Sequence, residues 1–225
     1  MIDLGNVSVI RQETVREKVY RLLKEAILTG KLLPGQYYTE IQIAETLEIS
    51  RTPVREAVND LINDKLLVAV PRRGVKVREF SETEVEQVFM LRRVIEGEVL
   101  NKVVKTITND CLIQLKRILQ EQKEAVEEQN RIQFIQLDQR FHNRLMEIAG
   151  YKLVQEMVNY LHNITRLIGH QAILVDGRMD EVIKEHQEIV KAIEEKDYIR
   201  SKEKMIVHLK NTEMSYRKIR QGEEI

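Results

Sequence analysis

Hydrophobic residues recur at helical spacing along the first third of the chain. Between residues 14 and 29 six apolar side chains follow a period of about 3.6 residues, which predicts an amphipathic helix. The same pattern predicts a short helix over residues 39–47 and a third helix that begins near Ser50. Two β-branched runs then flank residues 71–74 and predict a β-hairpin. Three helices followed by a hairpin are the elements of a winged helix-turn-helix.

The pattern changes after residue 78, because every later apolar run has helical spacing. We expect helices over residues 81–107, 110–128, 131–149, 151–175, 180–196 and 197–220. Ser81 and Glu84 have the spacing of a capping box at the start of the first of these helices. The sequence therefore predicts a mainly α protein with two domains. Residues 1–78 form the winged helix-turn-helix, and residues 79–225 form an all-α antiparallel helical bundle.

The composition and charge of the chain limit the classes of function that it can have. The 225 residues carry 36 basic and 36 acidic side chains, so the net charge is zero. Residues 1–78 hold 13 Lys and Arg against 10 Asp and Glu, whereas the remainder holds 23 against 26. The small basic excess at the N-terminal end is compatible with a nucleic-acid partner. The lone Cys111 excludes a disulfide scaffold. With no apolar run of about 18 residues, we expect a cytoplasmic protein without a membrane partner.

Basic and polar residues stand where the predicted winged helix-turn-helix would meet double-stranded DNA. The N-terminal end of a recognition helix contacts base edges, and Arg is the usual bidentate partner of guanine. The hairpin tip can reach the DNA backbone or the adjacent minor groove. Ordinary solvated arginines are the alternative, and the order of turn, helix and basic hairpin argues against it. The candidate DNA-binding residues are Arg51, Thr52, Arg55, Arg72, Arg73 and Gly74.

Four polar residues of the second half fall on or near the apolar faces of their predicted helices. Asp138 and His142 share the apolar face of helix 131–149, one turn apart. His186 is flanked by apolar residues, and His208 lies nearer the edge of its stripe. A lone inward histidine is usually a hydrogen-bonded core residue, but a carboxylate with several inward histidines suits a divalent metal. We therefore expect these four to bind a metal ion, Zn or Ni in preference to Fe or Mn.

A charged pair also falls on the apolar face of helix 81–107. Arg92 lies in the middle of the stripe, and Glu96, four residues later, shares that face. Two interpretations stay open. The pair is a structural ion pair, or Arg92 binds the carboxylate of a small anionic effector.

The segment from Pro34 to Val77, with SRTPVREAV at its centre, resembles the DNA-binding domain of the GntR family of bacterial transcription regulators. The resemblance implies a homodimer on a short inverted-repeat DNA operator, contacted by the residues given above. Three positions depart from the family pattern. Glu48 and Lys65 stand where the family often has Gly, and Ile41 stands where relatives often have a polar residue that faces DNA.

From about Phe80 onwards the chain resembles the FCD-type ligand-binding domain of the FadR subgroup in that family. LRRVIEGEV, DQRFH, EHQEIVKAI and the late His208 stand in the order of its metal-binding version. The resemblance implies that Asp138, His142, His186 and His208 are the metal ligands. It also implies that Arg92 lines an effector pocket, where an organic acid coordinates the open positions of the metal. Tyr151 departs from the subgroup, which often has Asn there.

These observations predict a ligand-responsive transcription regulator, most often a repressor in this family, whose operator affinity depends on a small organic acid. We expect no enzymatic activity, because the sequence has no HExxH motif, nucleophile elbow or phosphate-binding loop. Two alternatives stay open. A metal-dependent enzyme could act on a small acid by activating water or oxygen at the metal, and a pure metal sensor would respond without an organic effector.

Overall fold

The computed structural model describes residues 13–221, except for the side chains of residues 159, 160, 162, 163 and 170. The chain forms two compact units. The first comprises the residues up to 27 together with 32–78, and the second comprises residues 28–31 together with those from 79 onwards. Within the described range, no helix is both long and apolar enough to cross a membrane.

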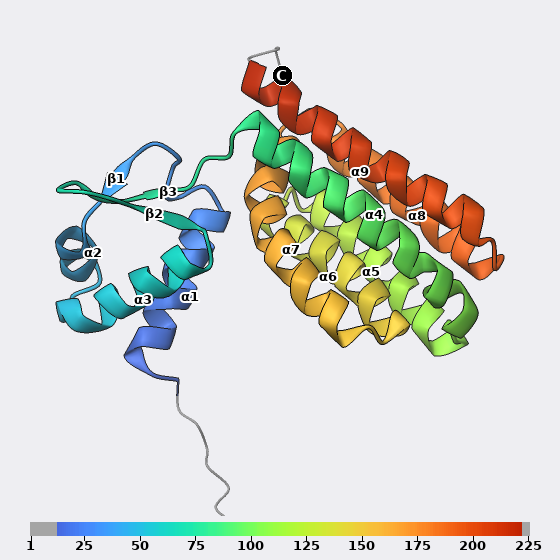
Figure 1. The fold of residues 1–225 in the computed structure, drawn as a ribbon, viewed down its shortest axis with the longest axis horizontal. Coiled ribbons are helices and arrows are strands. Elements are labelled where there is room, and N and C mark those ends of the chain that lie inside the picture. The colour runs from blue at the N-terminus through green and yellow to red at the C-terminus, as the bar shows by residue number, and fades with distance from the viewer. Residues whose placement is uncertain (1–12, 222–225) are drawn as a thin grey trace, which may run out of the picture. The chain divides into compact units, whose positions relative to one another are not determined.

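The first unit contains three helices and a small antiparallel sheet (Figure 1). Its elements are α1 (Val15–Leu28), β1 (Tyr37–Tyr38), α2 (Glu40–Thr46), α3 (Arg51–Asn63), β2 (Leu67–Val70) and β3 (Gly74–Val77). One face of α3 is buried through Val54, Ala57, Val58 and Leu61. The other face of α3 is therefore exposed to solvent. The predicted winged helix-turn-helix is confirmed.

The sheet has one strand more than the sequence analysis predicts. β3 is the central strand, paired with β2 from Leu67↔Val77 to Val70↔Gly74, and β1 pairs with its other edge. A two-residue strand is too short to show an alternating pattern. Gly74 makes the close approach of β1 possible, because a Cβ atom there would lie 2.3 Å from the carbonyl oxygen of Tyr38.

Three described non-glycine residues of this unit have the left-handed backbone conformation that favours glycine, and one of them is Arg72 at the hairpin tip, with a φ of 64°. Glu48, between α2 and α3, has a φ of 54°, and Lys65, before β2, has a φ of 60°. These are the two positions where this sequence departs from the glycine that is common in similar domains. A side chain in this conformation is strained by roughly 1–2 kcal/mol.

The second unit is a bundle of helices, as predicted (Figure 1). Its helices are α4 (Glu82–Thr106), α5 (Asn109–Glu127), α6 (Arg131–Ala149), α7 (Lys152–Ala172), α8 (Arg178–Glu194) and α9 (Tyr198–Gln221). α4 begins at the predicted capping box, in which Ser81 and Glu84 each bond to the backbone of the other. α9 packs along both α4 and α8, and α6 packs against α4, α5 and α7.

Apolar side chains fill the bundle in one large and one small cluster. The large cluster includes Phe89, Leu100, Phe141 and Leu209. The small cluster, around Phe134, lies where α5, α6 and α8 meet. Polar side chains are buried in the same unit, and most of them belong to one network: Arg92, Glu96, Gln122, His142, Arg178, His186 and His208. Because burying polar groups costs free energy unless they are paired, this network requires an explanation.

Candidate metal centre and DNA-binding surface

Three helices bring the four predicted metal ligands together. Asp138 and His142 lie one turn apart on α6, His186 lies on α8 and His208 lies on α9. One potential ligand atom from each residue lies within 4.8 Å of those of the other three. The three histidines are buried, whereas the side chain of Asp138 is 22% exposed. The cluster is therefore inside the bundle, with its carboxylate nearest to solvent.

The Nε2 atoms of the three histidines point into the cluster. His186 Nε2 lies 3.5 Å from Asp138 Oδ1, and His142 Nε2 lies 4.0 Å from Asp138 Oδ2. His208 Nε2 lies 3.2 Å from His142 Nε2. His186 Nε2 is buried and makes no hydrogen bond to any described residue. A cation bound here would coordinate both this nitrogen and the carboxylate of Asp138. The buried nitrogen without a hydrogen bond therefore fits a cation site.

The other ring nitrogen of each histidine faces an oxygen atom from a different helix. His142 Nδ1 lies 2.6 Å from Glu96 Oε2 on α4. The Nδ1 atoms of the other two histidines contact Gln122 on α5 and Glu185 on α8. These distances are 3.1 Å for His186 Nδ1 to Gln122 Oε1 and 2.7 Å for His208 Nδ1 to Glu185 Oε2. An oxygen acceptor at Nδ1 places the ring proton there and leaves the lone pair on Nε2.

The electrostatics of the cluster keep two of these rings neutral, as metal ligands must be. Burial, with smaller contributions from His208 and His142, holds the pKa of His186 well below its usual range. Burial also lowers the pKa of His208, although the hydrogen bond to Glu185 opposes this shift. Burial would raise the pKa of Glu185, but hydrogen bonds from His208 and Arg178 lower it to about 2. Glu185 is therefore an ionised acceptor.

Three imidazole lone pairs and one carboxylate make a donor set that fits a divalent cation such as Zn²⁺, Ni²⁺, Fe²⁺ or Mn²⁺. Without a cation, the lone pairs of His142 and His208 would face each other at 3.2 Å. When bound, the metal would supply positive charge and, at a coordination number above four, open positions for oxygen ligands.

Arginines neutralise the two carboxylates behind the histidines. Arg92 Nε donates to Glu96 Oε1 at 2.5 Å, and both side chains are buried. The two terminal nitrogens of Arg178 each donate to Glu185 at 2.8 Å. Arg92 therefore makes the structural ion pair that the sequence left open, and its binding of an effector carboxylate stays a prediction. Asp138 carries the remaining negative charge of this network.

Sequence reasoning missed Gln122 and Glu185, which orient two of the histidines, and Arg178, which pairs with Glu185. A signal for Gln122 was available, because it lies on the same face of α5 as the buried Leu119 and Ala125. An inward polar residue was the signal that identified Asp138. Arg178 and Glu185 are seven residues apart, and the sequence does not show that both contact α9.

The residues predicted to contact bases lie exposed at the start of α3. Arg51, Thr52 and Arg55 occupy its first turns. Arg55 Nε is held 3.1 Å from Glu40 Oε2 on α2. Ser50 is the N-cap residue as predicted, but its side chain makes no capping hydrogen bond. The N–H groups of a helix start attract phosphate, so this end of α3 is suited to DNA.

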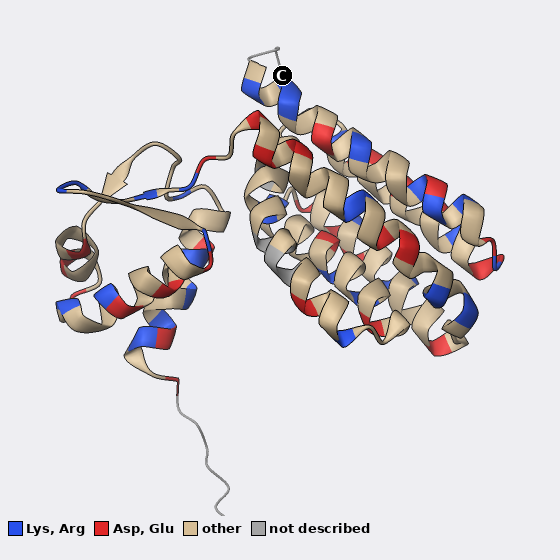
Figure 2. Cartoon of the chain, viewed as in Figure 1, with Lys and Arg blue, Asp and Glu red and all other residues tan. Residues whose placement is uncertain are grey.

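The hairpin between β2 and β3 presents Arg72, Arg73 and Gly74 to solvent. Lys and Arg residues gather at its tip (Figure 2). Arg73 packs its guanidinium over the ring of Tyr37, 5.2 Å from the ring centre, and also approaches the Tyr37 hydroxyl at 3.4 Å. Sequence reasoning missed Tyr37, which comes from the unpredicted strand β1.

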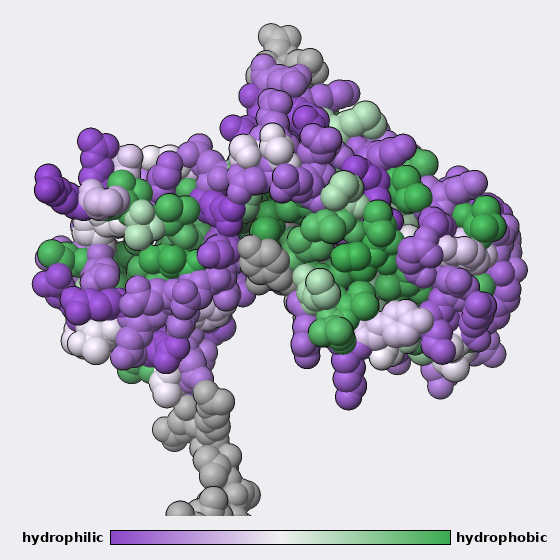
Figure 3. Space-filling model, viewed as in Figure 1, coloured by the Kyte–Doolittle hydropathy of each residue, from purple (hydrophilic) through white to green (hydrophobic). Residues whose placement is uncertain are grey.

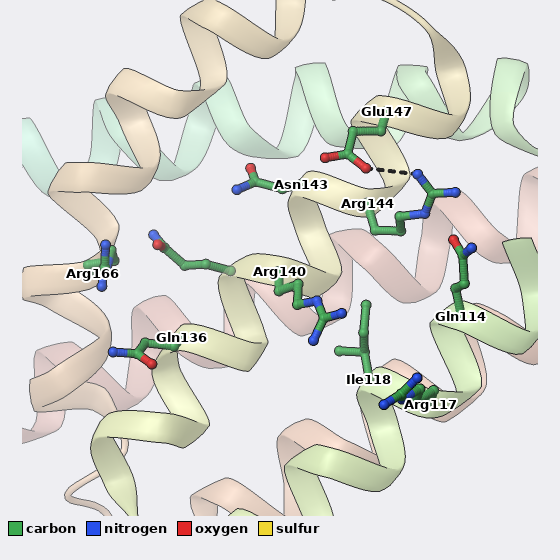
Figure 4. Close-up of a pocket in the computed structure, with 10 residues that line it drawn as sticks. Gln114, Arg117, Ile118, Gln136, Arg140, Asn143, Arg144, Glu147 and Arg166 are labelled. Atoms are coloured by element: carbon green, nitrogen blue, oxygen red, sulfur yellow. Dashed lines mark hydrogen bonds and ion pairs between the residues drawn. The ribbon is translucent and has the colours of Figure 1, made fainter. Parts of the chain in front are cut away.

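A separate polar hollow of about 630 Å³ crosses α5, α6 and α7 (Figure 4). Arg117, Arg140, Arg144 and Arg166 line it, and Arg144 is paired with Glu147 at 2.8 Å. None of the four candidate metal ligands lines this hollow. It is therefore distinct from the metal centre.

Each of the two units matches a known protein family. Residues 15–77 match the gntR family of bacterial regulatory proteins, and residues 87–211 match the FCD domain. The HTH-type transcriptional repressor RspR of Escherichia coli K12 is 27% identical over 209 residues, which cover 93% of this chain and 92% of that protein. The gluconate operon transcriptional repressor of Bacillus subtilis 168 is 24% identical over 180 residues, 78% of this chain and 74% of that protein.

Solved structures share the fold at low sequence identity. E. coli McbR/YncC has a TM-score of 0.77 at 20% identity, over 95% of this chain and 100% of that one. A putative GntR regulator from Rhodococcus sp. RHA1 also has a TM-score of 0.77, at 23% identity over 93% of this chain and 99% of that one. The winged helix-turn-helix, the helical bundle and these matches agree with one another. The chain therefore belongs to the GntR family of bacterial transcription regulators and carries an FCD domain.

Proposed function

We propose that this chain is a transcriptional repressor whose affinity for operator DNA is controlled by a small organic acid bound at a divalent-metal centre. Residues 1–78 bind DNA, and residues 79–225 bind the metal and the acid. The observation that carries the proposal is the convergence of Asp138 with the Nε2 atoms of His142, His186 and His208. The protein acts by binding and not as an enzyme.

The charge of the centre favours an anionic effector. Arginines neutralise Glu96 and Glu185, and Glu181, which also pairs with Arg178, is 64% exposed to solvent. Among the buried groups alone, a divalent cation on Asp138 leaves a net charge of about +1 inside the bundle. A buried net charge costs free energy, which a carboxylate ligand would offset. Arg92 is one contact away from His142 through Glu96, and its guanidinium has terminal N–H donors in addition to Nε. We assign Arg92 to the acid's carboxylate.

An inverted-repeat operator requires two copies of the DNA-binding domain. Exposed apolar side chains on α4 and α7, two helices that pack together, supply a surface for a second copy. They include Val94 on α4 and Leu153 and Met157 on α7. Figure 3 shows an apolar area on this part of the bundle. An effector that favours one arrangement of the dimer would change the spacing of the two α3 helices and so the operator affinity.

A thermal-shift screen of carboxylic acids, with the protein either metal-loaded or chelator-treated, tests this function. A ligand that binds only the folded protein raises its melting temperature. We expect stabilisation by at least one acid in the metal-loaded protein, and none after chelation or in the Asp138→Ala variant. In Arg92→Ala the response to the acid should fall while bound metal is retained. An acid that stabilises wild type and Asp138→Ala equally would refute the metal-dependent effector site.

The pure metal sensor has one observation in its favour. Four protein ligands can complete a tetrahedral Zn²⁺ site and leave no open position for an acid. Selection of bound genomic DNA fragments by the metal-loaded and the metal-free protein separates the two functions. Release or capture of the same fragments by metal alone, with no effect of any acid, would favour the sensor.

A further inference from the structure

Gln122 is the partner of His186 Nδ1, and it is buried, uncharged and able to present either a donor or an acceptor to that nitrogen. It lies on the apolar face of α5, and its side chain is fully buried. Its Oε1 atom lies 3.1 Å from His186 Nδ1. Its Nε2 atom has no hydrogen-bond partner among the described residues. The contact with His186 is therefore the interaction that orients this amide.

The orientation of the amide determines which nitrogen of His186 carries the proton. With Oε1 toward the ring, Nδ1–H donates to it, and Nε2, 3.5 Å from Asp138 Oδ1, keeps its lone pair. With the amide turned over, its amino group would donate to Nδ1, and the proton would move to Nε2. A protonated Nε2 could bind Asp138 but no cation. Only the first arrangement makes His186 a metal ligand.

The other two histidines do not have this choice. His142 Nδ1 faces Glu96 and His208 Nδ1 faces Glu185, and ionised carboxylates only accept hydrogen bonds. His186 alone is oriented by a group that can present either a donor or an acceptor. Its metal-binding form therefore depends on Gln122 in a way that His142 and His208 do not depend on a single amide.

We propose that Gln122 is a positioning residue of the metal centre, which fixes His186 in the tautomer that binds a divalent cation. The inference rests on the proposed metal site. Removal of the partner that orients a metal-bound histidine typically weakens metal affinity about 10- to 100-fold. Gln122 should have an effect of this size although it never contacts the metal.

Metal affinity of the full chain, measured by competition with a chelator for Zn²⁺ and for Ni²⁺, tests the proposal. In Gln122→Leu, which can neither donate nor accept, we expect affinity to fall about 10- to 100-fold. In Gln122→Glu, which accepts, affinity should equal or exceed that of wild type. Gln120→Leu is the matched control, because Gln120 is exposed on the same helix and bonds only to Glu124 among the contacts described. It should bind like wild type.

The tautomer itself gives a second readout. In ¹⁵N–¹H NMR spectra of the metal-loaded wild type, His186 should carry its proton on Nδ1 and bind through Nε2. Binding through Nδ1, or unchanged affinity in Gln122→Leu, would overturn the proposal. If Gln122→Leu does not fold, the wild-type spectrum and the affinity of Gln122→Glu decide the matter. A wild type that binds neither metal would overturn the proposed metal centre together with this inference, whereas tight binding in all variants overturns the role of Gln122 alone.

Discussion

Replacement of Glu185 by Gln removes one charge from the network behind the metal centre. The carboxylate of Glu185 accepts two bonds of 2.8 Å from Arg178 and one of 2.6 Å from Asn211, and it faces His208 Nδ1 at 2.7 Å. Its side chain is 14% exposed, so solvent screens these contacts little. Although burial opposes ionisation, the hydrogen bonds from His208 and Arg178 lower the pKa of Glu185 from 4.5 to about 2.

The size of the expected effect follows from that shift. One pKa unit corresponds to about 1.4 kcal/mol, so the lowered pKa of Glu185 contributes about 3 kcal/mol to folding. Because the pKa is depressed in the folded state, this contribution is present above pH 4.5 and is lost as the pH falls toward 2. Glutamine resembles the protonated carboxyl group. Glu185→Gln should therefore lower the free energy of unfolding by about 3 kcal/mol at pH 7 and by progressively less below pH 4.5.

Urea unfolding of chelator-treated protein, followed by circular dichroism between pH 7 and pH 3, measures this difference. Glu188→Gln is the control, because Glu188 lies on the same helix but pairs with Arg200 and Lys204 at the surface. We expect no measurable change in that variant. A loss below about 1 kcal/mol for Glu185→Gln at pH 7 would refute the reasoning, as would a loss that stays constant down to pH 3.

Three further substitutions test other parts of the structure. Lys65→Gly should raise the free energy of unfolding by about 1 kcal/mol in thermal denaturation, because it relieves a positive φ; a destabilised variant would contradict this. Tyr151→Asn should also stabilise by about 1 kcal/mol. Tyr151 is the N-cap of α7 and makes no side-chain capping bond. Asn130, the N-cap of α6, has nearly the same backbone angles and accepts a bond from the Gln133 N–H, so an asparagine in place of Tyr151 should do the same. An unchanged melting temperature would show that the new side chain does not cap α7. Arg51→Ala should weaken binding to selected operator fragments by about 1–3 kcal/mol in fluorescence anisotropy and relax the preference at one base position; equal losses on all sequences would indicate a phosphate contact instead.

The sequence alone predicts the helices well because their apolar stripes are long. α4, α6 and α9 begin and end within one residue of their expected positions. β1 has only Tyr37 and Tyr38, and its place in the sheet depends on a contact with Lys76 far along the chain. Local pattern cannot reveal such a pairing.

The candidate ligands were predictable for a related reason. A polar residue on an apolar helix face is anomalous by itself, and this singles out Asp138 and His186 without knowledge of their neighbours. An inward position marks Glu96 and Gln122 in the same way, but it does not show which histidine nitrogen each of them contacts, because that depends on how the helices rotate against one another. Glu185, for example, is next to His186 in sequence but faces His208 on α9.

The oxygen atoms that orient the three histidines come from α4, α5 and α8, while the candidate ligands themselves lie on α6, α8 and α9. Five helices therefore share one small set of contacts. Substitutions scattered over most of this domain should therefore weaken metal binding as the loss of a ligand does. Titration of the purified variants with metal would separate two causes: variants with a weakened centre bind at a higher metal concentration, and variants that fail to fold do not bind.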